Sequence, residues 1–335
     1  MTWVSNRREC RGQLVSSRVA LVTCKELPGL DEDTRCLIPP LAARGIAATA
    51  AVWDDPEVDW KYFDLVIVRS CWDYVSRRDE FLAWAIQVPN LVNPAAVLAW
   101  NTHKGYLREL AACDIPIVPT TWLPPQKEWT PPERGDWVIK PAVSLASLDA
   151  GRYRMDDRLQ RRLAVEHVSR LHAVGSTVMV QPYMHGIDDE GETSLVYLGS
   201  VFSHAMRKAA VLTGPDVGVD RRFLPQGGLH LRAHRPTARE LVTADQVLAA
   251  VPTSHHQLLY ARVDLVSGAD GRSVLMELEL TEPQLYLHAA PGAAHRMAAA
   301  IEAQLLRRGR APLRPLLDEG EASEEHEGGL LWQTA

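Results

Sequence analysis

The sequence predicts a mixed α/β (α+β) protein, and two patterns carry this prediction. Near the N-terminus, residues 18–23 (RVALVT), 46–53 and 63–69 (FDLVIVR) have the apolar composition of strands, and residues 33–44 have the caps and apolar spacing of a helix. Strand, helix and strand at this spacing indicate a small parallel sheet. Towards the C-terminus, paired apolar runs joined by short glycine-containing turns indicate antiparallel hairpins.

Length and composition limit the class of protein. A chain of 335 residues with 46% hydrophobic and 23% charged residues is typical of a soluble globular protein with one large α/β unit or two domains. The net charge of −6 argues against a general role in binding nucleic acid or a membrane surface. The five cysteines are scattered and form no CxxC pair, which argues against a disulfide framework or a zinc site and favours a reducing cytoplasm. No apolar run is long enough for a membrane span, and residues 1–17 are too polar for a secretory signal.

The remaining elements follow in order along the chain. Apolar spacing and caps predict helices, and short apolar runs bounded by turn residues predict strands. The expected helices are 101–113, 156–173, 237–250 and 293–308, and the expected strands are 117–122, 137–141, 177–183, 193–199, 201–208 and 229–234. Residues 209–228 have the composition of a mobile loop, and the acidic stretch 318–329 is expected to be disordered.

A hairpin at 257–287 carries three carboxylates that determine much of the functional interpretation. Asp264 lies on its first strand, and Glu277 and Glu279 lie on its second. Since side chains alternate along a strand, Glu277 and Glu279 are expected on one face and Met276 on the other. Carboxylates that face one another inside an apolar sheet repel unless a cation lies between them, and Mg²⁺ prefers such oxygen ligands. The alternative is an ordinary hairpin with one solvated face.

The segment RSCWDY follows the third predicted strand of the parallel sheet, where ligands of such sheets bind. Arg69 could grip a carboxylate, while Trp72, Asp73 and Tyr74 could frame a small polar molecule. The alternative is that Trp72 and Tyr74 are core aromatics and that Arg69 pairs with Asp73.

Two lysines and a loop are candidates for binding phosphate. Lys104 falls in the first turn of a predicted helix, where its charge opposes the helix dipole, so helix stability does not explain it. Lys140 lies on a very apolar strand, where a bound phosphate would supply the partner that its charge requires. The loop 142–151, with Ser144 and Ser147, could fold over phosphates through its backbone N–H groups, although it lacks the P-loop pattern.

The strand 177–183 ends in Gln-Pro-Tyr, and acidic residues follow. Pro182 has no N–H to donate, so the chain is expected to leave the sheet there as a hinge that could accept an adenine ring. One of the acidic residues could hydrogen-bond a ribose, and the others are expected to be solvated. These residues are Asp188, Asp189, Glu190 and Glu192.

Together, these features occur in an order that resembles the ATP-grasp superfamily of carboxylate–amine ligases. The ordered set is Lys104, Lys140, the small-residue loop, the Gln-Pro-Tyr hinge, Arg207, Asp264 and Glu277-x-Glu279, and the similarity covers roughly residues 18–309. The resemblance implies an N-terminal pre-ATP-grasp domain with a parallel sheet, a central lid and a C-terminal antiparallel catalytic domain, with ATP between two antiparallel sheets. The corresponding segments are a leader 1–17, the substrate domain 18–100, the lid and ATP-binding subdomain 101–185, the catalytic domain 186–309 and an acidic tail 310–335.

The resemblance also assigns roles to individual residues. It implies ATP and Mg²⁺ as cofactors, with Mn²⁺ as an alternative metal. By position, the resemblance implies that Lys104 and Lys140 bind phosphate and that Ser144 to Gly151, including Ser147, is the phosphate loop. It implies an adenine hinge of Gln181, Tyr183 and Met184, with Asp188 or Glu192 in contact with the ribose or nucleotide. It also implies that Arg207 meets the transferred phosphate and that magnesium is bound by Asp264, Glu277 and Glu279. The chain departs from the family at Glu279, where many members have Asn. A third carboxylate would hold the metals more tightly, and the alternative is that Glu279 is protonated or lies outside the direct metal ligands.

The segments VRSCWDY, WNTHKGYL, KPAVSLASLDAG and MELELTEP are most similar to the bacterial group that contains the cycloserine-forming ligase of antibiotic biosynthesis. This similarity implies an ADP-forming carbon–nitrogen ligase in the cytoplasm. ATP would activate a carboxylate or carbamoyl oxygen of a small amino-acid derivative, a nitrogen would displace phosphate, and the ring closure would be intramolecular. Arg69, Trp72, Asp73 and Tyr74 are expected to hold the amino-acid end of that substrate.

Two other functions remain open. One is an intermolecular ligase that joins two amino acids or extends a peptide, and the other is a nucleotide-binding module that has lost catalysis. The expected partner is a small molecule rather than a nucleic acid or a membrane, and a homodimer remains open.

Overall fold

The computed structural model describes residues 17–309, apart from 217, 221, 223–230 and 255–256, and contains three sheets in chain order. The expected leader falls outside this range except for Ser17, and the acidic tail 310–335 falls outside it completely. The three sheets lie within the segments predicted as substrate domain, lid and catalytic domain, although β1 already begins at Ser17. None of the helices in the described part of the chain is long and apolar enough to cross a membrane.

The N-terminal sheet is parallel, with strand order β2-β1-β3-β4, as the alternation of strands and helix predicts. Its strands are β1 (Ser17–Thr23), β2 (Ile46–Val52), β3 (Leu65–Ser70) and β4 (Leu91–Val92), and its helices are α1 (Glu32–Arg35), α2 (Ile38–Ala42), α3 (Arg78–Gln87) and α4 (Ala95–Asn101). Short 3₁₀ helices cover Trp60–Tyr62 and Trp72–Ser76. The predicted helix 33–44 is two short helices, because Pro39 cannot donate to the carbonyl of Arg35 and instead lies in the first turn of the next helix.

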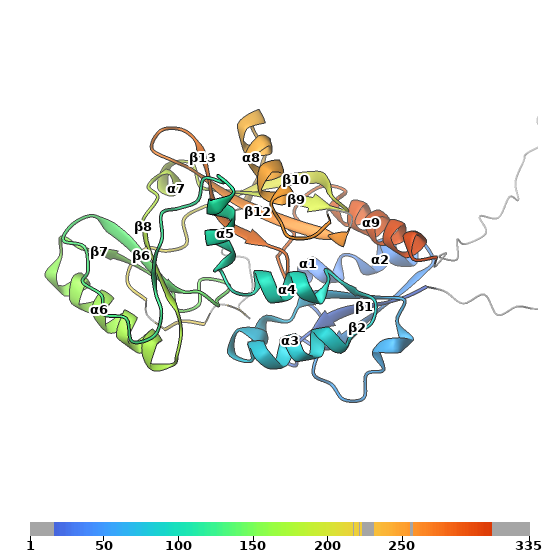
Figure 1. Ribbon diagram of the computed structural model, residues 1–335. Helices are drawn as coiled ribbons and strands as arrows, with labels where there is room; N and C mark the ends of the chain where they lie inside the picture. The colour runs from blue at the N-terminus through green and yellow to red at the C-terminus, as the bar shows by residue number, and fades with distance from the viewer. Residues whose placement is uncertain (1–16, 217, 221, 223–230, 255–256, 310–335) are drawn as a thin grey trace, which may run out of the picture.

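The second sheet is antiparallel, with order β5-β8-β6-β7, and α6 covers one of its faces (Figure 1). Its elements are β5 (Thr121–Leu123), β6 (Asp136–Pro141), β7 (Gly151–Arg154), α6 (Arg158–Ala173) and β8 (Val178–Pro182). The strand predicted at 117–122 begins only at Thr121, since Ile117 pairs instead with Leu275 of the third sheet. Asp157 caps α6 by accepting hydrogen bonds from the N–H groups of Leu159 and Gln160.

The third sheet is also antiparallel, with order β11-β10-β9-β12-β13. Its strands are β9 (Glu192–Leu198), β10 (Val201–Lys208), β11 (Leu231–His234), β12 (Tyr260–Ser267) and β13 (Ser273–Glu279). The helices α5 (Tyr106–Ala112), α7 (Gly186–Asp189), α8 (Ala238–Ala249) and α9 (Ala293–Arg307) complete the chain. This sheet contains the predicted hairpin, whose two strands are joined through a turn at Gly268 to Arg272.

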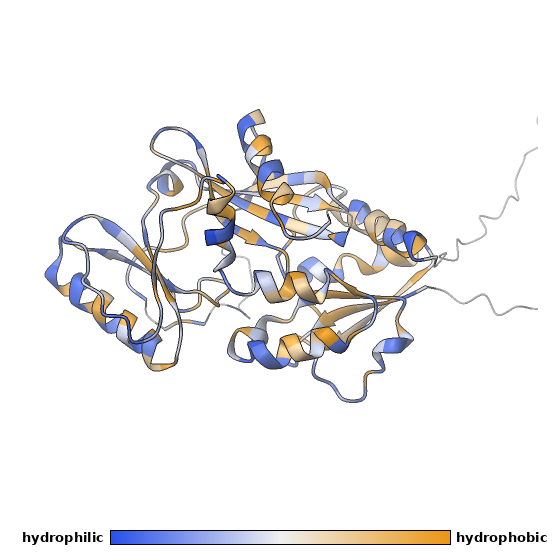
Figure 2. Ribbon diagram, in the orientation of Figure 1, coloured by the Kyte–Doolittle hydropathy of each residue, from blue (hydrophilic) through white to orange (hydrophobic). Residues whose placement is uncertain are grey.

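The apolar faces of these elements join the N-terminal and third sheets into one core. One cluster contains Val19 and Leu21 of β1, Val196 of β9, and Met297 and Ile301 of α9. Figure 2 shows hydrophobic residues along the strands and on the inward side of the long helices, with hydrophilic residues outside. The lid sheet has its own core under α6 and lies apart from the other two sheets in Figure 1, at the left of the view.

Candidate active site

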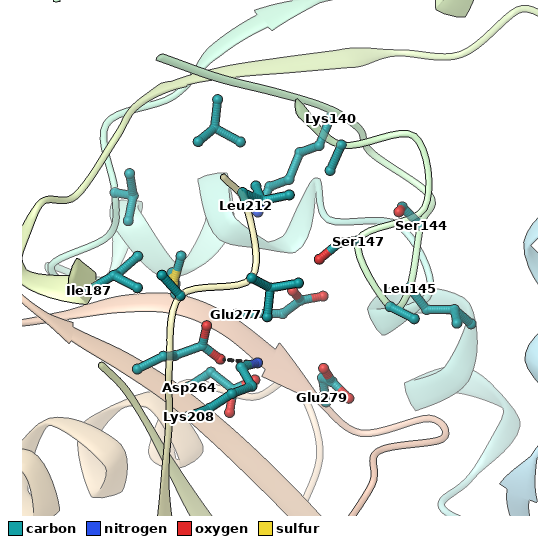
Figure 3. Close-up of a pocket in the computed structure, with 18 of the residues that line it drawn as sticks. Lys140, Ser144, Leu145, Ser147, Ile187, Lys208, Leu212, Asp264, Glu277 and Glu279 are labelled. Carbon is teal, nitrogen blue, oxygen red and sulfur yellow. Dashed lines mark ion pairs between the residues drawn. The ribbon is translucent and has the colours of Figure 1, made fainter. Parts of the chain in front are cut away.

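A cavity of about 530 Å³ lies between the lid sheet and the third sheet. Figure 3 shows Lys140, Ser144 and Ser147 on one side, with Asp264, Glu277 and Glu279 facing them. Among the described residues, five cationic and five acidic side chains line this cavity: Lys104, Lys140, Lys208, Arg222 and Arg262, and Glu192, Asp264, Glu277, Glu279 and Glu282. The sequence prediction of a nucleotide site between two antiparallel sheets therefore corresponds to a cavity in that place.

A β-bulge shapes the acidic wall. Asp264 is opposite Glu277, but the next residue, Leu265, is opposite Leu275, so Met276 is an extra residue in β13. Met276 consequently lines the cavity together with Glu277. The expectation that Met276 points away from the carboxylates was wrong, because strict alternation fails at a bulge.

The three predicted metal ligands all line the cavity, and each has a basic partner. Arg262 lies between Asp264, at 2.7 Å, and Glu279, and Glu277 lies 2.9 Å from Lys104. Burial opposes the ionisation of Asp264, but Arg262 holds its pKa below the usual range. Burial likewise opposes the ionisation of Glu277, whose pKa Lys104 and Lys140 keep low. Burial raises the pKa of Glu279 to about 8, with the neighbouring carboxylates adding to the shift and Arg262 opposing it.

These carboxylates have the chemistry that a hard divalent cation requires. The raised pKa of Glu279 shows that its charge is poorly compensated by protein groups alone. Within the described part of the chain, no three His, Cys, Asp or Glu side chains converge as a ready ligand set, since the carboxylates are turned towards Arg262 and Lys104. Their assignment as magnesium ligands stays a prediction.

Lys104 lines the cavity, but it does not lie in the first turn of a helix as predicted from the sequence. The predicted helix 101–113 is interrupted, because α4 ends at Asn101 and α5 begins at Tyr106. Lys104 therefore occupies the turn between them, where the helix-dipole argument does not apply. It is only 6% exposed, and its Nζ donates to the carbonyl of Ser144 at 2.6 Å. The contact ties this lysine to the predicted phosphate loop.

Two further lysines reach the cavity, and one is not the residue expected. Lys140 projects from β6, where burial lowers its pKa and Glu277 opposes that shift. Lys208 lies 2.8 Å from Glu192, which holds the pKa of this buried lysine above its usual value. Arg207, the predicted phosphate contact, points to the other face of β10 and donates to Thr193 and Glu240. It is not among the side chains that line the cavity in the described structure, whereas Lys208 is.

The predicted phosphate loop follows β6 and folds back on itself. The hydroxyl of Ser144 donates to the carbonyl of Leu148 at 2.7 Å, and Ala146, Ser147 and Asp149 have positive φ angles. Such conformations turn successive backbone groups in ways that regular structure does not. Ser144 and Ser147 both line the cavity, as expected.

The Gln-Pro-Tyr hinge forms the apolar end of the cavity. Gln181, Tyr183 and Met184 line it, and Met184 and Met276 belong to one small hydrophobic cluster. Asp188 is exposed, accepts a hydrogen bond from the Tyr183 hydroxyl at 2.6 Å and does not line the main cavity of the described residues. Of the two acids considered for the nucleotide, the structure places Glu192 in the cavity.

The segment predicted to hold the organic substrate is divided. Trp72 lines the cavity, but Arg69 is buried beside Asp33, and Asp73 accepts from the indole of Trp53 at 2.9 Å. Tyr74 is buried and does not line the cavity, although its side chain interacts with Glu282, which does. The alternative pairing of Arg69 with Asp73 was also wrong, since Asp73 pairs with Arg77 at 3.4 Å.

Several cavity residues escaped the sequence interpretation. Arg262, two residues before Asp264, shares its side of β12 and could have been found from this alternation. Glu282 lies in the quoted segment MELELTEP but follows the end of the predicted strand. Lys208, Arg222, Gln284 and Tyr286 also line the cavity.

Comparisons with known proteins agree with this arrangement. The family model described as the N-terminal domain of D-cycloserine synthetase DcsG matches residues 19–93. The cycloserine biosynthesis protein DcsG of Streptomyces lavendulae is 33% identical over 308 residues, covering 86% of this chain and 98% of that protein. The crystal structure of D-cycloserine synthetase DcsG, also 33% identical, aligns with a TM-score of 0.73 over 86% of this chain and 100% of that chain.

A more distant structure shares the fold. The D-alanine–D-alanine ligase of Bacillus anthracis aligns with a TM-score of 0.60 at 13% identity, covering 88% of this chain and 98% of that chain. The predicted ATP-grasp fold is therefore confirmed. From its extended similarity to DcsG, the chain belongs to the ATP-grasp ligase family that contains the cycloserine biosynthesis protein DcsG.

Proposed function

We propose that this ATP-grasp carbon–nitrogen ligase uses ATP and Mg²⁺ to close a ring within one small amino-acid derivative, as in cycloserine synthesis. The main observation is a cavity of about 530 Å³ that is lined by lysines from three separate segments and by three carboxylates. A space of this size is within the usual range for small-molecule sites. The 33% identity to DcsG supports cycloserine-type chemistry.

In this proposal, the apolar hinge holds the adenine and the lysines hold the phosphates. Gln181, Tyr183 and Met184 form the base pocket, while Lys104, Lys140 and Lys208 surround the transferred phosphoryl group. Placing Lys208 in this role replaces Arg207. A divalent metal held by Asp264, Glu277 and Glu279 would neutralise charge on the phosphate oxygens.

The chemistry needs no covalent nucleophile from the protein. An oxygen of the substrate carboxylate, or of its carbamoyl group, attacks the γ-phosphorus as the bond to ADP breaks. A nitrogen of the same molecule then attacks the activated carbon, and the bond to phosphate breaks. The lysines and Arg262 hold positive charge where negative charge develops, and the enclosing lid excludes water that would hydrolyse the intermediate.

The test is ADP release with ATP and Mg²⁺ from three sets of substrates: O-ureido-D-serine alone, single amino acids and pairs of amino acids. Release with the ureido compound alone, together with loss of that compound, would support ring closure. Release only with pairs would make the protein an intermolecular ligase, and retained ATP binding without ADP from any substrate would indicate a binding module. EDTA should abolish turnover and Mg²⁺ should restore it, with Mn²⁺ as the alternative metal.

The Glu277→Gln variant connects this chemistry to the acidic wall. Because it removes a charge from the proposed metal site, we expect a loss of kcat on the order of 10²-fold. Its melting temperature and ATP binding serve as checks on folding. Near-normal turnover would remove the metal assignment.

We further propose a cytoplasmic protein that acts on a small molecule, with a homodimer as an open alternative to a monomer. The free thiols at Cys24, Cys36, Cys71 and Cys113 support a reducing location. Light scattering of the purified protein would test the dimer.

A further inference from the structure

The cavity has two chemically different ends. Its apolar end lies near Val118, Ile187 and Met276, which belong to one hydrophobic cluster. Along β13 from Met276 come Glu277 and Glu279, and the chain then leaves the strand. At about 3.3 Å per residue, a residue beyond the end of β13 lies well away from the apolar end. The cavity therefore runs from an apolar pocket, past the carboxylates, to an end formed by the segment after β13.

Glu282 lines this far end together with Trp72, Arg222 and Gln284. Trp72 begins the 3₁₀ helix that follows β3, and its carbonyl accepts a hydrogen bond from Arg222 at 3.0 Å. If the nucleotide occupies the apolar end and the lysine-rich centre, the organic substrate must occupy this end. Glu282 is the acidic side chain that this end of the cavity offers among the described residues.

The position of Glu282 is fixed from two sides. Its carboxylate interacts with the side chain of Tyr74, a buried ring that stacks on Phe81 with centroids 5.2 Å apart. The segment that follows is held by Asp33, which accepts from the N–H of Leu285 at 2.8 Å. The carboxylate is therefore presented by a rigid support, which is a requirement for selective binding.

Glu282 differs from the other acidic side chains of the cavity in its partners. Asp264 and Glu279 pair with Arg262, and Glu277 pairs with Lys104. In the part of the chain that the structure describes, Glu282 has no ion pair, and the side chain of Tyr74 with which it interacts is a neutral phenol. Burial raises the pKa of Glu282 to about 7, although the side chain of Tyr74 and the more distant Lys104 oppose this shift. A carboxylate in this setting gains most from a ligand that brings a positive charge.

We infer that Glu282 is the subsite for the protonated amine of an amino-acid substrate, an inference that rests on the proposed function. An ammonium group next to the reacting carboxylate would donate to Glu282 while the carboxylate points to the phosphate-binding lysines. Tyr74 acts as a positioning residue, since its side chain interacts with Glu282 and does not line the cavity of the described residues. The enzyme would thereby select substrates with a free primary amine over analogues that lack it.

The experiment compares Glu282→Gln with the wild-type protein on matched ligands. The ligands are O-ureido-D-serine and its des-amino analogue, in which hydrogen replaces the amine. Binding is measured by calorimetry in the presence of a non-hydrolysable ATP analogue and Mg²⁺, and turnover by ADP release. Glu282→Gln removes the proposed charged hydrogen bond between Glu282 and the substrate ammonium group. It should therefore weaken binding of O-ureido-D-serine by about 10- to 100-fold and change binding of the des-amino analogue by less than about threefold.

Two further variants sharpen the comparison. Glu166→Gln changes an exposed glutamate of α6 and should leave every parameter unchanged. Tyr74→Phe keeps the ring but removes the phenol, and should weaken binding of the amine less than Glu282→Gln does. The affinity of each variant for ATP reports whether the nucleotide end is intact.

The inference fails if Glu282→Gln binds the amine as well as wild type, or if it loses the same factor on both ligands. It also fails if the wild-type protein binds neither ligand. Selective binding of the amine that depends on Glu282, without ADP release from any substrate, would instead overturn the proposed function and keep the subsite.

Discussion

Arg69 and Asp33 form an ion pair in the interior, with Nη2 of Arg69 3.7 Å from Oδ2 of Asp33 and side chains that are 1% and 2% exposed. Arg69 also donates to the carbonyl of Pro283 at 3.0 Å, and Asp33 accepts from the backbone of Leu285 and Leu287. The pair thus connects β3 and α1 to the segment that carries Glu282.

We therefore expect Arg69→Ala to act mainly on stability. It removes the guanidinium partner of the buried Asp33 carboxylate and leaves His288 as the remaining cationic side chain beside it among the described residues, and should lower the free energy of unfolding by about 3 kcal/mol. Urea denaturation measures this value, and Arg162→Ala, at an exposed arginine of α6, serves as control with a loss below about 1 kcal/mol. A fully stable Arg69→Ala protein with only a raised KM for the organic substrate would restore the original substrate-binding interpretation.

His288 makes the same interface sensitive to pH. Its Nδ1 lies 3.0 Å from Asp33, and this hydrogen bond raises the pKa of His288 above its usual value of 6.5, while burial opposes the shift. Folding therefore favours the protonated form of His288. The stabilisation that this charge gives to the folded state is complete below pH 6.5 and is lost as pH rises through the raised pKa of His288 in the folded protein.

The melting temperatures of wild type and His288→Gln should differ most at pH 6 and converge above the folded pKa. Differential scanning fluorimetry between about pH 5.5 and 9 measures this difference. The exposed His295 on α9 provides a control, since His295→Gln should follow the wild-type profile at every pH. A gap that stays constant across the range would show that the His288 charge makes no contribution.

Lys208 and Arg207 are adjacent in sequence but lie on opposite faces of β10. Lys208→Met removes a charge that lines the cavity, and we expect kcat to fall on the order of 10²-fold. Arg207→Met removes donors to Thr193 and Glu240, so it should lower the melting temperature but change kcat by less than about fivefold. Steady-state ADP release separates the two. The reverse ranking would return the phosphate contact to Arg207.

Arg170 of α6 connects two loops at the cavity. It lies 2.8 Å from Asp149 of the phosphate loop and also pairs with Asp216, whose N–H donates to the hydroxyl of Tyr153 at 3.2 Å. Residues 209–212, just before Asp216, line the cavity. Because Arg170→Ala releases both loops, hydrogen exchange should become faster in residues 142–150 and 209–216, with a loss of ATP affinity of a few-fold.

Arg162→Ala on the same helix provides the matched control, since Arg162 pairs only with Glu166 among the described residues. It should leave exchange in both loops at the wild-type rate. Equal exchange rates in Arg170→Ala and wild type would show that the two ion pairs do not restrain these loops.

The strands were predicted well from the sequence, because a buried strand requires a short run of apolar residues that is visible in the sequence itself. The parallel sheet and the hairpin at 257–287 follow from apolar runs and turn residues that lie next to one another in sequence. The cavity positions of Lys140, Asp264 and Glu277 could be predicted for the same reason, since a charge on an apolar strand needs a partner.

Other features depend on contacts that no local pattern contains. The partner of Arg69 is Asp33, on a different element, and the carbonyl that it binds belongs to Pro283. The bulge that turns Met276 into the cavity arises from the pairing of β13 with β12. The register of β10 with β9 likewise determines that Lys208 and not Arg207 faces the cavity. The sequence of β10 alone does not distinguish the two residues.

The equal numbers of cationic and acidic side chains around the cavity have a kinetic consequence. Among the described residues, and above about pH 8 where Glu279 and Glu282 are both ionised, five positive and five negative charges lie close together, so their fields largely cancel a short distance from the opening. The whole chain also has a net charge of −6, which gives no long-range attraction for a polyanion. Nucleotide capture should therefore proceed by ordinary diffusive encounter, at a rate that changes little with ionic strength. The strength of binding would come from short-range contacts made after ATP has entered.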